Sequence, residues 1–330
     1  MLQRLKDLGK WWYLIPALLV LAYPLKANSY WIDVGFFFGL YILLGLSLNI
    51  IVGHAGLYNL GHAAFYAIGA YVTAILNTQF GIPIFWLLPV SALVAAAVAF
   101  VIVRPILHLR GDYLLIVTLG FSEIVRIALI NDPLGLTGGP NGVFGIARPY
   151  LFGFKLSQPN HFYYLIWLLV IIVILAQRRL DNSRIGRAWN YIREDELAAE
   201  AMGIDTTGVK LLGFVVGAAL AGVAGNVYAA KMMIISPDSF TIWESVIMFA
   251  IVILGGAGSI PGVIIGTFGM VVLPEIFREF AEYRMLIFGG AMIIMMIFRP
   301  QGLWPSQRMR RAMEDDEVEL PEPEQSAVSI

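Results

Sequence analysis

The feature that most constrains this chain is a run of 70 residues, Val34 to Val103, without a single Asp, Glu, Lys or Arg. A helix needs about 20 apolar residues to cross the hydrocarbon core of a bilayer, so this run has room for two or three crossings. The chain of 330 residues is 59% hydrophobic and 14% charged, against about 25% charged in a typical soluble domain. A soluble fold of this size could not hide so much apolar surface. The sequence therefore predicts an all-α polytopic membrane protein.

Apolar stretches between polar, glycine and proline breaks predict about ten transmembrane or partly re-entrant helices. The expected helices start near Trp11, Val34, Gly61, Ile84, Tyr113, Phe162, Val209, Ile242, Ile260 and Arg284. The first follows a basic stretch and could be a signal peptide. The aromatic run Trp11-Trp12-Tyr13 instead favours a retained helix anchored at the membrane interface, and no small-x-small cleavage site follows it.

The distribution of Lys and Arg predicts that both termini are cytoplasmic. With that orientation the inside loops carry 14 basic residues and the outside loops six, as the positive-inside rule requires. The formal net charge of −1 hides this bias, because seven acids lie between Glu314 and Glu324. We therefore divide the chain into a transmembrane domain over residues 1–311, which includes a cytoplasmic loop over 177–208, and an acidic disordered tail over 312–330.

Several classes of chemistry lack the residues they need. The chain has no cysteine, and its four histidines form no HExxH pair, which excludes disulfides and a helix-borne zinc site of that type. The glycine-rich stretch Gly255–Gly262 lacks the Gly-Lys-Ser/Thr of a phosphate-binding loop, so we interpret it as a tight turn between two helices. No cofactor is expected in this chain. Its scattered basic residues predict no nucleic-acid binding.

Polar residues inside the apolar helices are candidates for a translocation path. Glu123 and Arg126 share one helix face, and they are either a self-neutralising structural pair or part of a polar lining. The segment from Asn49 to His62 concentrates glycines and polar groups between two helices, as broken helices do. A metal site from His54 and His62 is an alternative that lacks a third ligand. The candidate path residues are Asn49, His54, Asn59, His62, Thr118, Glu123 and Arg126.

Small residues recur at helical spacing in the second half of the chain. Gly213 and Gly217, Gly222 and Gly225, and Gly262 and Gly266 are such pairs. They predict close packing between helix backbones and carry no information about a substrate.

The loop over 177–208 contains a helix-prone stretch, Leu197 to Gly203, directly after Arg193-Glu-Asp-Glu196. An amphipathic helix in such a loop either lies on the lipid or docks on a partner. The acids of this stretch would repel anionic headgroups, which favours docking on a protein. Asp205 and Thr206 are expected to start the next membrane helix.

Several sequence blocks resemble one known family, the permease subunits of ATP-binding-cassette (ABC) importers for branched-chain amino acids, and in particular their longer, M-type permease. The resemblance extends from about Gly45 to Gly302. It rests on Gly45-Leu-Ser-Leu-Asn49 with Gly61-His-Ala-Ala-Phe65, Arg110-Gly-Asp-Tyr-Leu114 with Thr118-Leu-Gly, Leu136-Thr-Gly-Gly-Pro-Asn-Gly142, Ser183-Arg-Ile-Gly-Arg187, Arg193 to Gly203, Gly255 to Gly262 and Phe298-Arg-Pro-Gln-Gly302.

This resemblance implies a permease subunit in a bacterial plasma (inner) membrane. It implies as partners a second homologous permease, two cytoplasmic ATPases that bind ATP and Mg²⁺, and an extracytoplasmic solute-binding protein. Residues 193–203 would be the coupling helix that fits a groove of the ATPase, although Leu197 stands where the importer signature has Glu. The expected coupling residues are Arg187, Arg193, Glu194, Asp195, Glu196, Ala199, Glu200 and Gly203.

Alternatives to this function remain at the level of sequence. Relatives of the family transport urea, short amides or other amino acids. A secondary transporter coupled to protons or sodium through Glu123 and the His54–His62 region is a second alternative. A membrane enzyme is a third, although no converging nucleophile, base or metal set supports it.

Overall fold

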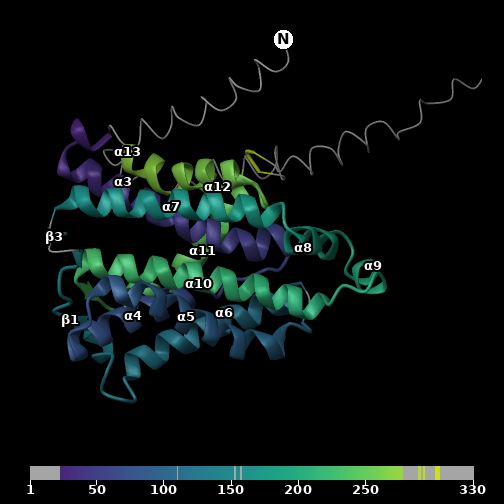
Figure 1. The fold of residues 1–330 in the computed structure, drawn as a ribbon, viewed down its shortest axis with the longest axis horizontal. Helices are drawn as coiled ribbons and strands as arrows, with labels where there is room; N and C mark the ends of the chain where they lie inside the picture. Colours follow the sequence, from purple (N-terminus) through teal and green to yellow (C-terminus); the bar gives the residue numbers. More distant parts are fainter. Residues whose placement is uncertain are drawn as a thin grey trace, which may run out of the picture.

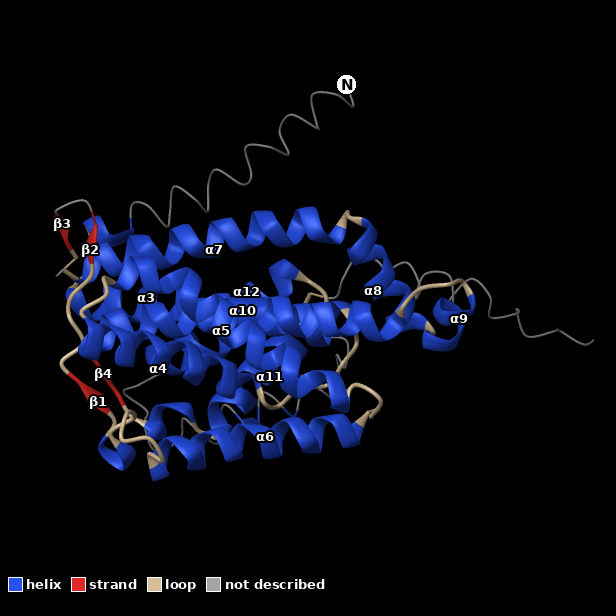
Figure 2. Ribbon diagram, turned by 60° about the horizontal axis from the view of Figure 1, so that its bottom comes forward, coloured by secondary structure: helices blue, strands red, loops and turns tan. Residues whose placement is uncertain are grey.

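The computed structural model describes residues 23–109, 111–151, 154–156, 158–277, 289–290, 293 and 302–304. The described chain is an elongated bundle of helices (Figure 1). Short strands lie at one end of the bundle, and the small helices α8 and α9 project at the opposite end (Figure 2). We refer to these as the strand end and the α9 end.

The helices of the bundle follow each other in a simple order along the chain. They are α3 (Ser29–Asn49), α4 (His62–Phe80), α5 (Ile84–Val103), α6 (Asp112–Asn131), α7 (Pro159–Asp181), α8 (Arg184–Glu194), α9 (Glu196–Ala201), α10 (Thr206–Met232), α11 (Ile242–Gly255), α12 (Ile260–Thr267) and α13 (Leu273–Ile276). Two π-helical segments, Ile50–His54 after α3 and Phe268–Val272 between α12 and α13, extend the neighbouring α-helices. Short 3-10 turns occupy Tyr23–Leu25, Arg104–Ile106, Gly139–Asn141 and Pro237–Phe240.

Eight of the ten expected membrane helices have a helix at the predicted place. The helices expected near Trp11 and Arg284, and the tail over 312–330, lie outside the described residues. Within the described residues, six helices are long and apolar enough to cross a bilayer, so a polytopic helical protein is confirmed. These six are Ser29–His54, Ile84–Ile106, Asp112–Asn131, Pro159–Asp181, Thr206–Met232 and Pro237–Gly255. The total of ten crossings stays a prediction.

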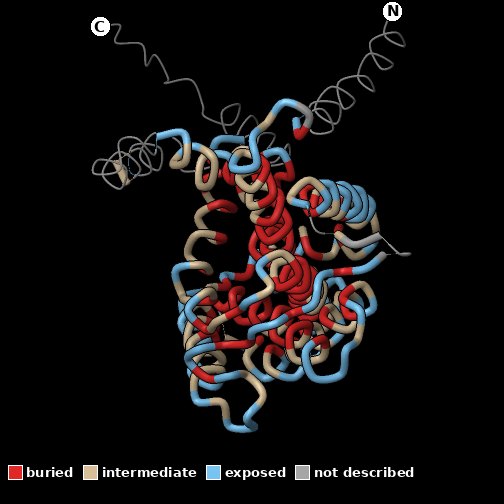
Figure 3. The backbone as a smooth tube through the Cα atoms, turned by 90° about the vertical axis from the view of Figure 1, so that its left-hand side faces the viewer, coloured by how far each residue is buried: buried red, intermediate tan, exposed pale blue. Residues whose placement is uncertain are grey.

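Helix α10 packs most extensively against α4 and α5. Buried residues are concentrated in the interior of the bundle (Figure 3). A Cβ on Gly222 of α10 would lie 2.6 Å from the Ser91 carbonyl oxygen of α5, and one on Gly225 would lie 2.6 Å from the Ala70 nitrogen of α4. Only hydrogen atoms fit at these points, so the backbones touch directly. The predicted packing role is confirmed for Gly217, Gly222, Gly225, Gly262 and Gly266, which meet backbone atoms, whereas Gly213 meets the Trp189 side chain at 3.4 Å.

A buried polar network joins the same three helices. The Thr73 and Ser91 hydroxyl oxygens lie 2.8 Å apart, and the Asn226 amide donates to the Thr73 Oγ1 at 2.9 Å. Because an apolar environment offers no competing water, each of these groups needs a protein partner. The network therefore fixes how the three helices are rotated against each other.

Two short antiparallel ribbons close the strand end. β1 (Val143–Phe144) pairs with β4 (Ile234–Ile235), and β2 (Tyr150–Leu151) pairs with β3 (Phe154–Lys155). The first ribbon ties the long loop after α6 to the end of α10. That loop begins at Asp132, whose carboxylate accepts the backbone N–H groups of Leu136, Thr137 and Gly138 at 2.6, 2.8 and 3.1 Å. The turn-forming sequence after Leu136 is thus held by one side chain.

Candidate functional site

The chain breaks its helical course between α3 and α4. After the π-helical turn Ile50–His54, residues 55–61 run without regular structure, and α4 begins at His62. His62 is fully buried, and its Nε2 lies 2.6 Å from the Ser47 Oγ, a residue seven positions before the end of the span Ser29–His54. Helix α4 therefore starts inside the bundle rather than at its end, which is a discontinuous helix of the predicted kind.

The hydrogen bonds of the break define the state of His62. The Ser47 hydroxyl donates to the Leu44 carbonyl at 2.6 Å, so the Nε2–H of His62 must donate to Ser47. The other ring nitrogen then accepts from the Asn59 Nδ2 at 3.5 Å, while the Asn59 Oδ1 accepts from the Gly61 N–H at 2.8 Å. A neutral imidazole satisfies all these partners. His62 caps a broken helix, and no cluster of potential metal ligands occurs among the described residues.

Two further helices close the break from the side. The Thr118 Oγ1 of α6 accepts from the Leu60 N–H at 3.1 Å, and the Ser245 Oγ of α11 accepts from the Ala63 N–H at 2.9 Å. The structure thus brings together three predicted residues, Asn59, His62 and Thr118. It adds Ser47 and Ser245, which sequence reasoning missed because single serines in apolar helices carry no distinguishing signal.

The other predicted histidine belongs to a different contact. The His54 Nε2 lies 3.1 Å from the Gln177 Nε2 and 3.4 Å from the Asp181 Oδ1, both on α7. His54 and His62 therefore do not meet in one site. The described structure gives the alternative of a shared metal site no support.

A second group of predicted residues meets at the α9 end, where the Arg193 side chain contacts the membrane helices. Its Nη1 donates to the Gly53 carbonyl of the π-helical turn. The Asn49 Oδ1 accepts from the Gly258 N–H, in the turn between α11 and α12, at 2.8 Å. We call Asn49, Gly53, Arg193 and Gly258 the Arg193 junction. It joins a predicted path residue and a predicted coupling residue through two glycines.

The glycines of the Arg193 junction are required by its geometry. Gly258 has a φ of +84°, and a Cβ there would lie 3.1 Å from the Arg193 Nη1. A Cβ on Gly53 would collide with the Asn49 Oδ1 and the Gly258 nitrogen. Burial lowers the pKa of the Arg193 guanidinium, yet arginine stays protonated at any physiological pH. The junction therefore holds a permanent positive charge against a backbone carbonyl.

The pair of Glu123 and Arg126 forms on α6 as its spacing predicts. The Arg126 Nη2 and Nε lie 2.5 and 3.0 Å from the Glu123 Oε1. The two side chains are 30% and 25% exposed, and the Arg126 Nη1 also lies 3.9 Å from the Asp238 Oδ1. Because each charge is cancelled by its own helix neighbour, this geometry matches a structural ion pair.

The loop over 177–208 folds into α8 and α9, and its predicted coupling residues have different environments. The Asp195 carboxylate caps α9 by accepting the N–H groups of Leu197 and Ala198 at 2.9 and 3.1 Å. Glu196 forms an ion pair of 2.6 Å with the buried Lys210 of α10, and Ala199 is buried. These residues hold α9 onto the bundle.

The remaining predicted coupling residues are exposed. They are Arg187, Glu194, Glu200 and Gly203, whose φ of +83° ends α9. Two apolar side chains are exposed beside them, Leu197 at 65% and Met202 at 73%. The expected start of the next helix at Asp205 and Thr206 is confirmed, since α10 begins at Thr206 and the Asp205 Oδ1 accepts the Gly208 N–H at 3.0 Å. The tip of α9 therefore combines exposed apolar and acidic side chains.

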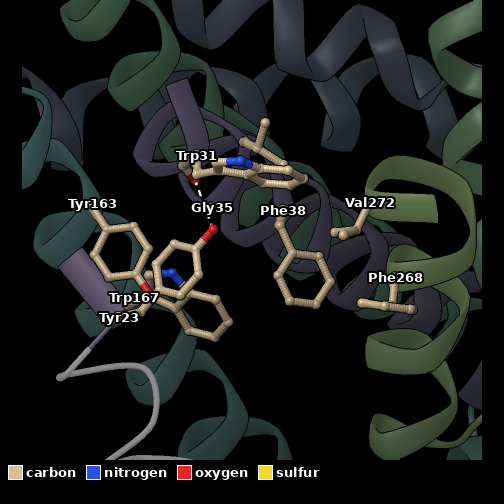
Figure 4. A pocket seen from close by; sticks show the side chains of 9 residues that line it. Tyr23, Trp31, Gly35, Phe38, Tyr163, Trp167, Phe268 and Val272 are labelled. Carbon is tan, nitrogen blue, oxygen red and sulfur yellow. Dashed lines mark hydrogen bonds between the residues drawn. The ribbon is translucent and has the colours of Figure 1, made fainter. Parts of the chain in front are cut away.

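An apolar pocket of about 230 Å³ opens between α3, α7 and the second π-helical segment. Figure 4 shows its aromatic lining, which includes Trp31, Phe38, Trp167 and Phe268. The Tyr23 hydroxyl at its edge donates to the Trp31 carbonyl at 3.1 Å. With no ionic group in its lining, this pocket is unsuited to hold a zwitterion.

The arrangement is that of a transport component of a membrane: apolar helices, a helix broken at depth and a projecting helix with an exposed apolar tip. Comparisons with known proteins give the particular family. Residues 31–296 match the family described as "Branched-chain amino acid transport system / permease component". The chain belongs to this family.

Individual relatives agree with the family assignment. The chain is 44% identical to the high-affinity branched-chain amino acid transport system permease protein LivM of Salmonella typhimurium, and equally to that of Escherichia coli, over 88% of this chain and 74% of each relative. It is also 28% identical to the permease protein LivH of Escherichia coli, over 80% of this chain and 90% of the relative. No solved structure matches the chain.

Proposed function

We propose that this chain forms one half of the translocation path of an ATP-driven importer for branched-chain amino acids. The observation that carries the proposal is the family match over residues 31–296, together with 44% identity to the LivM permease proteins. The matches do not favour an ion-coupled transporter or a permease for urea or amides.

The second half of the path would be a homologous permease. One organism, Escherichia coli, has both a LivM and a LivH relative of this chain, which supports a pair of related permeases. Two ATPases with bound ATP and Mg²⁺ would supply the energy, and an extracytoplasmic solute-binding protein would deliver the amino acid. This chain would bind no cofactor of its own.

The tip of α9 would dock on an ATPase. Its exposed Leu197 and Met202 offer an apolar contact surface, and Glu200 offers a charge beside them. Arg193 and Glu196 would transmit the motion, since they tie α8 and α9 to the π-helical turn and to α10. This placement makes the α9 end cytoplasmic, in agreement with the excess of basic residues on that side and with cytoplasmic termini.

The break between α3 and α4 would face the path. Helix breaks expose backbone groups that can contact a polar solute, and Asn59, His62 and Thr118 would hold the backbone in position. In this interpretation Glu123 and Arg126 stabilise α6 and lie outside the path.

Co-purification through a tag on this chain tests the proposal. We expect a second permease and two ATPases to be retained, and the complex to take up labelled leucine into proteoliposomes only with ATP and a loaded binding protein. Uptake by this chain alone under a proton or sodium gradient would refute it and establish the secondary transporter instead.

A further inference from the structure

Glu244 is an acidic side chain of the bundle that was not among the sequence-predicted residues. Glu244 lies in the first turn of α11, and its Oε2 accepts the hydroxyl proton of Tyr41 at 2.7 Å. Tyr41 is the thirteenth residue of the 26-residue span Ser29–His54. Glu244 therefore lies at the middle depth of the bundle, where an ionised group is most costly.

Glu244 differs from three other partly buried acids of the described helices, Asp33, Glu123 and Glu196, in having no cation beside it. The described carboxylates of Glu123, Asp33 and Glu196 each pair with a basic side chain, at 2.5, 2.6 and 2.6 Å. Within the described residues, no Lys, Arg or His pairs with Glu244, and Tyr41 alone donates a hydrogen bond to it. An ionised carboxylate at this depth is stabilised by a positive partner or water, so Glu244 can accept a cation, whereas the other three acids already have theirs.

The surroundings of Glu244 are aromatic. Phe240 precedes it by four residues, and the rings of Tyr66 of α4 and Tyr228 of α10 lie 5.4 Å apart beside Phe240. The Phe240 ring joins these two, with ring centroids 5.0 Å from Tyr66 and 5.9 Å from Tyr228. Ring faces attract ammonium groups through their quadrupole. A carboxylate close to several aromatic rings is therefore suited to bind an ammonium group.

The positive end of a helix lies next to this position. Ser245, the neighbour of Glu244, accepts the Ala63 N–H of the first turn of α4. The N-terminus of a helix carries a partial positive charge. The N–H groups of Leu60, Gly61 and Ala63 already have acceptors, so this end of α4 acts on the carboxylate of a molecule bound at Glu244 through its partial charge. Glu244, Tyr41 and Tyr228 keep part of their surface exposed, which leaves access to the position.

We propose that Glu244, with the rings of Tyr66 and Tyr228, forms a transient site for the ammonium group of an α-amino acid in transit. The site rests on the proposed function and adds to it a residue that recognises the substrate inside the membrane. The carboxylate of the amino acid is oriented by the start of α4, and the tyrosine rings cover the ammonium group.

The experiment uses the complete complex in proteoliposomes, with binding protein loaded with labelled leucine. Glu244→Gln keeps the size and a hydrogen-bond acceptor for Tyr41 but removes the charge. We expect at least about a tenfold loss of uptake per ATP, since a charged hydrogen bond contributes at least that factor. ATP hydrolysis should still respond to the loaded binding protein. Glu244→Asp should retain part of the uptake.

A second readout separates a binding site from a structural role. After trapping with ATP and vanadate, we expect the wild-type complex to retain labelled leucine and the Glu244→Gln complex to lose it. Asp238→Asn is the matched control, because this acid precedes α11 by only four residues but is 81% exposed. It should change neither quantity. Wild-type uptake and retention in Glu244→Gln would overturn the inference.

A further variant decides the question should Glu244→Gln fail to assemble. Tyr228→Leu keeps an apolar side chain and the carboxylate but removes one ring, and we expect about a threefold to thirtyfold loss of retained leucine. Unchanged retention would overturn the inference. Failure of the wild-type complex to transport leucine would instead contradict the proposed function, so the two failures are distinguishable.

Discussion

The contact between Arg193 and the Gly53 carbonyl gives the sharpest test of how α8 and α9 act on the membrane helices. Arg193→Ala removes the donor and leaves a buried carbonyl at the end of the π-helical turn. It also removes the side-chain stem, which lies so close to Gly56 that a Cβ there would be 2.9 Å from the Arg193 Cγ. Helix α8 would then lose its hydrogen bond to the π-helical turn after α3.

The magnitude follows from the type of bond. A hydrogen bond from a charged donor contributes about 1.5–3 kcal/mol, and each 1.4 kcal/mol corresponds to about a factor of ten. If this bond carries the coupling between the ATPase-facing helices and the path, its loss should reduce uptake per ATP by about 10- to 150-fold. Arg193→Lys keeps the charge but not the planar donor group, so its defect should be smaller.

The assay is uptake of labelled leucine and release of phosphate, measured in the same proteoliposomes. Arg184→Ala is the matched control, because Arg184 is an exposed arginine at the start of the same helix. We expect both variants to assemble and only Arg193→Ala to lose uptake per ATP. If Arg193→Ala transports as well as Arg184→Ala, this contact does not carry the coupling and the reasoning is wrong.

Three other predictions address the packing and the loops. Glu196→Gln should lower the thermal midpoint of the purified complex, because it leaves the buried Lys210 of α10 without its negative partner. The expected cost is about 1–3 kcal/mol. An unchanged midpoint would contradict this. Gly69→Ala should reduce the free energy of unfolding by about 1–3 kcal/mol, since its Cβ would lie 2.5 Å from a Cα of α10. Gly120→Ala is the control, because a Cβ there would have no atom of this chain within 4 Å, and it should leave the free energy of unfolding unreduced. Unfolding of both variants in detergent measures the difference. Hydrogen bonds, the strongest from the Thr137 backbone N–H, hold the pKa of Asp132 below its ordinary value. The carboxylate therefore stabilises its loop fully above about pH 4. This stabilisation is lost only as the pH falls through the lowered pKa. Asp132→Asn should speed hydrogen exchange in this loop at pH 7, and lowering the pH of the wild type to about 5 should not.

Local sequence patterns predicted those parts of the fold that depend on neighbouring residues. The charge-free run and the later apolar stretches predicted eight helices that the described structure contains. The i, i+3 spacing predicted the pair of Glu123 and Arg126, and the sequence around Asp205 and Thr206 predicted the start of α10. Each of these features is decided within one or two helical turns, so the sequence carries the whole signal.

Contacts between distant segments were decided by tertiary structure alone. Tyr41 and Glu244 are 203 residues apart, Asn49 and Gly258 are 209 apart, and Arg193 and Gly53 are 140 apart. In a soluble helix the polar face shows which way the helix is turned, but helices apolar on every side carry no such signal. Their rotation is set by glycine contacts such as Gly222 against α5 and by buried polar pairs. Local sequence therefore specifies which segments are helices, and the packing of these helices decides which polar groups meet.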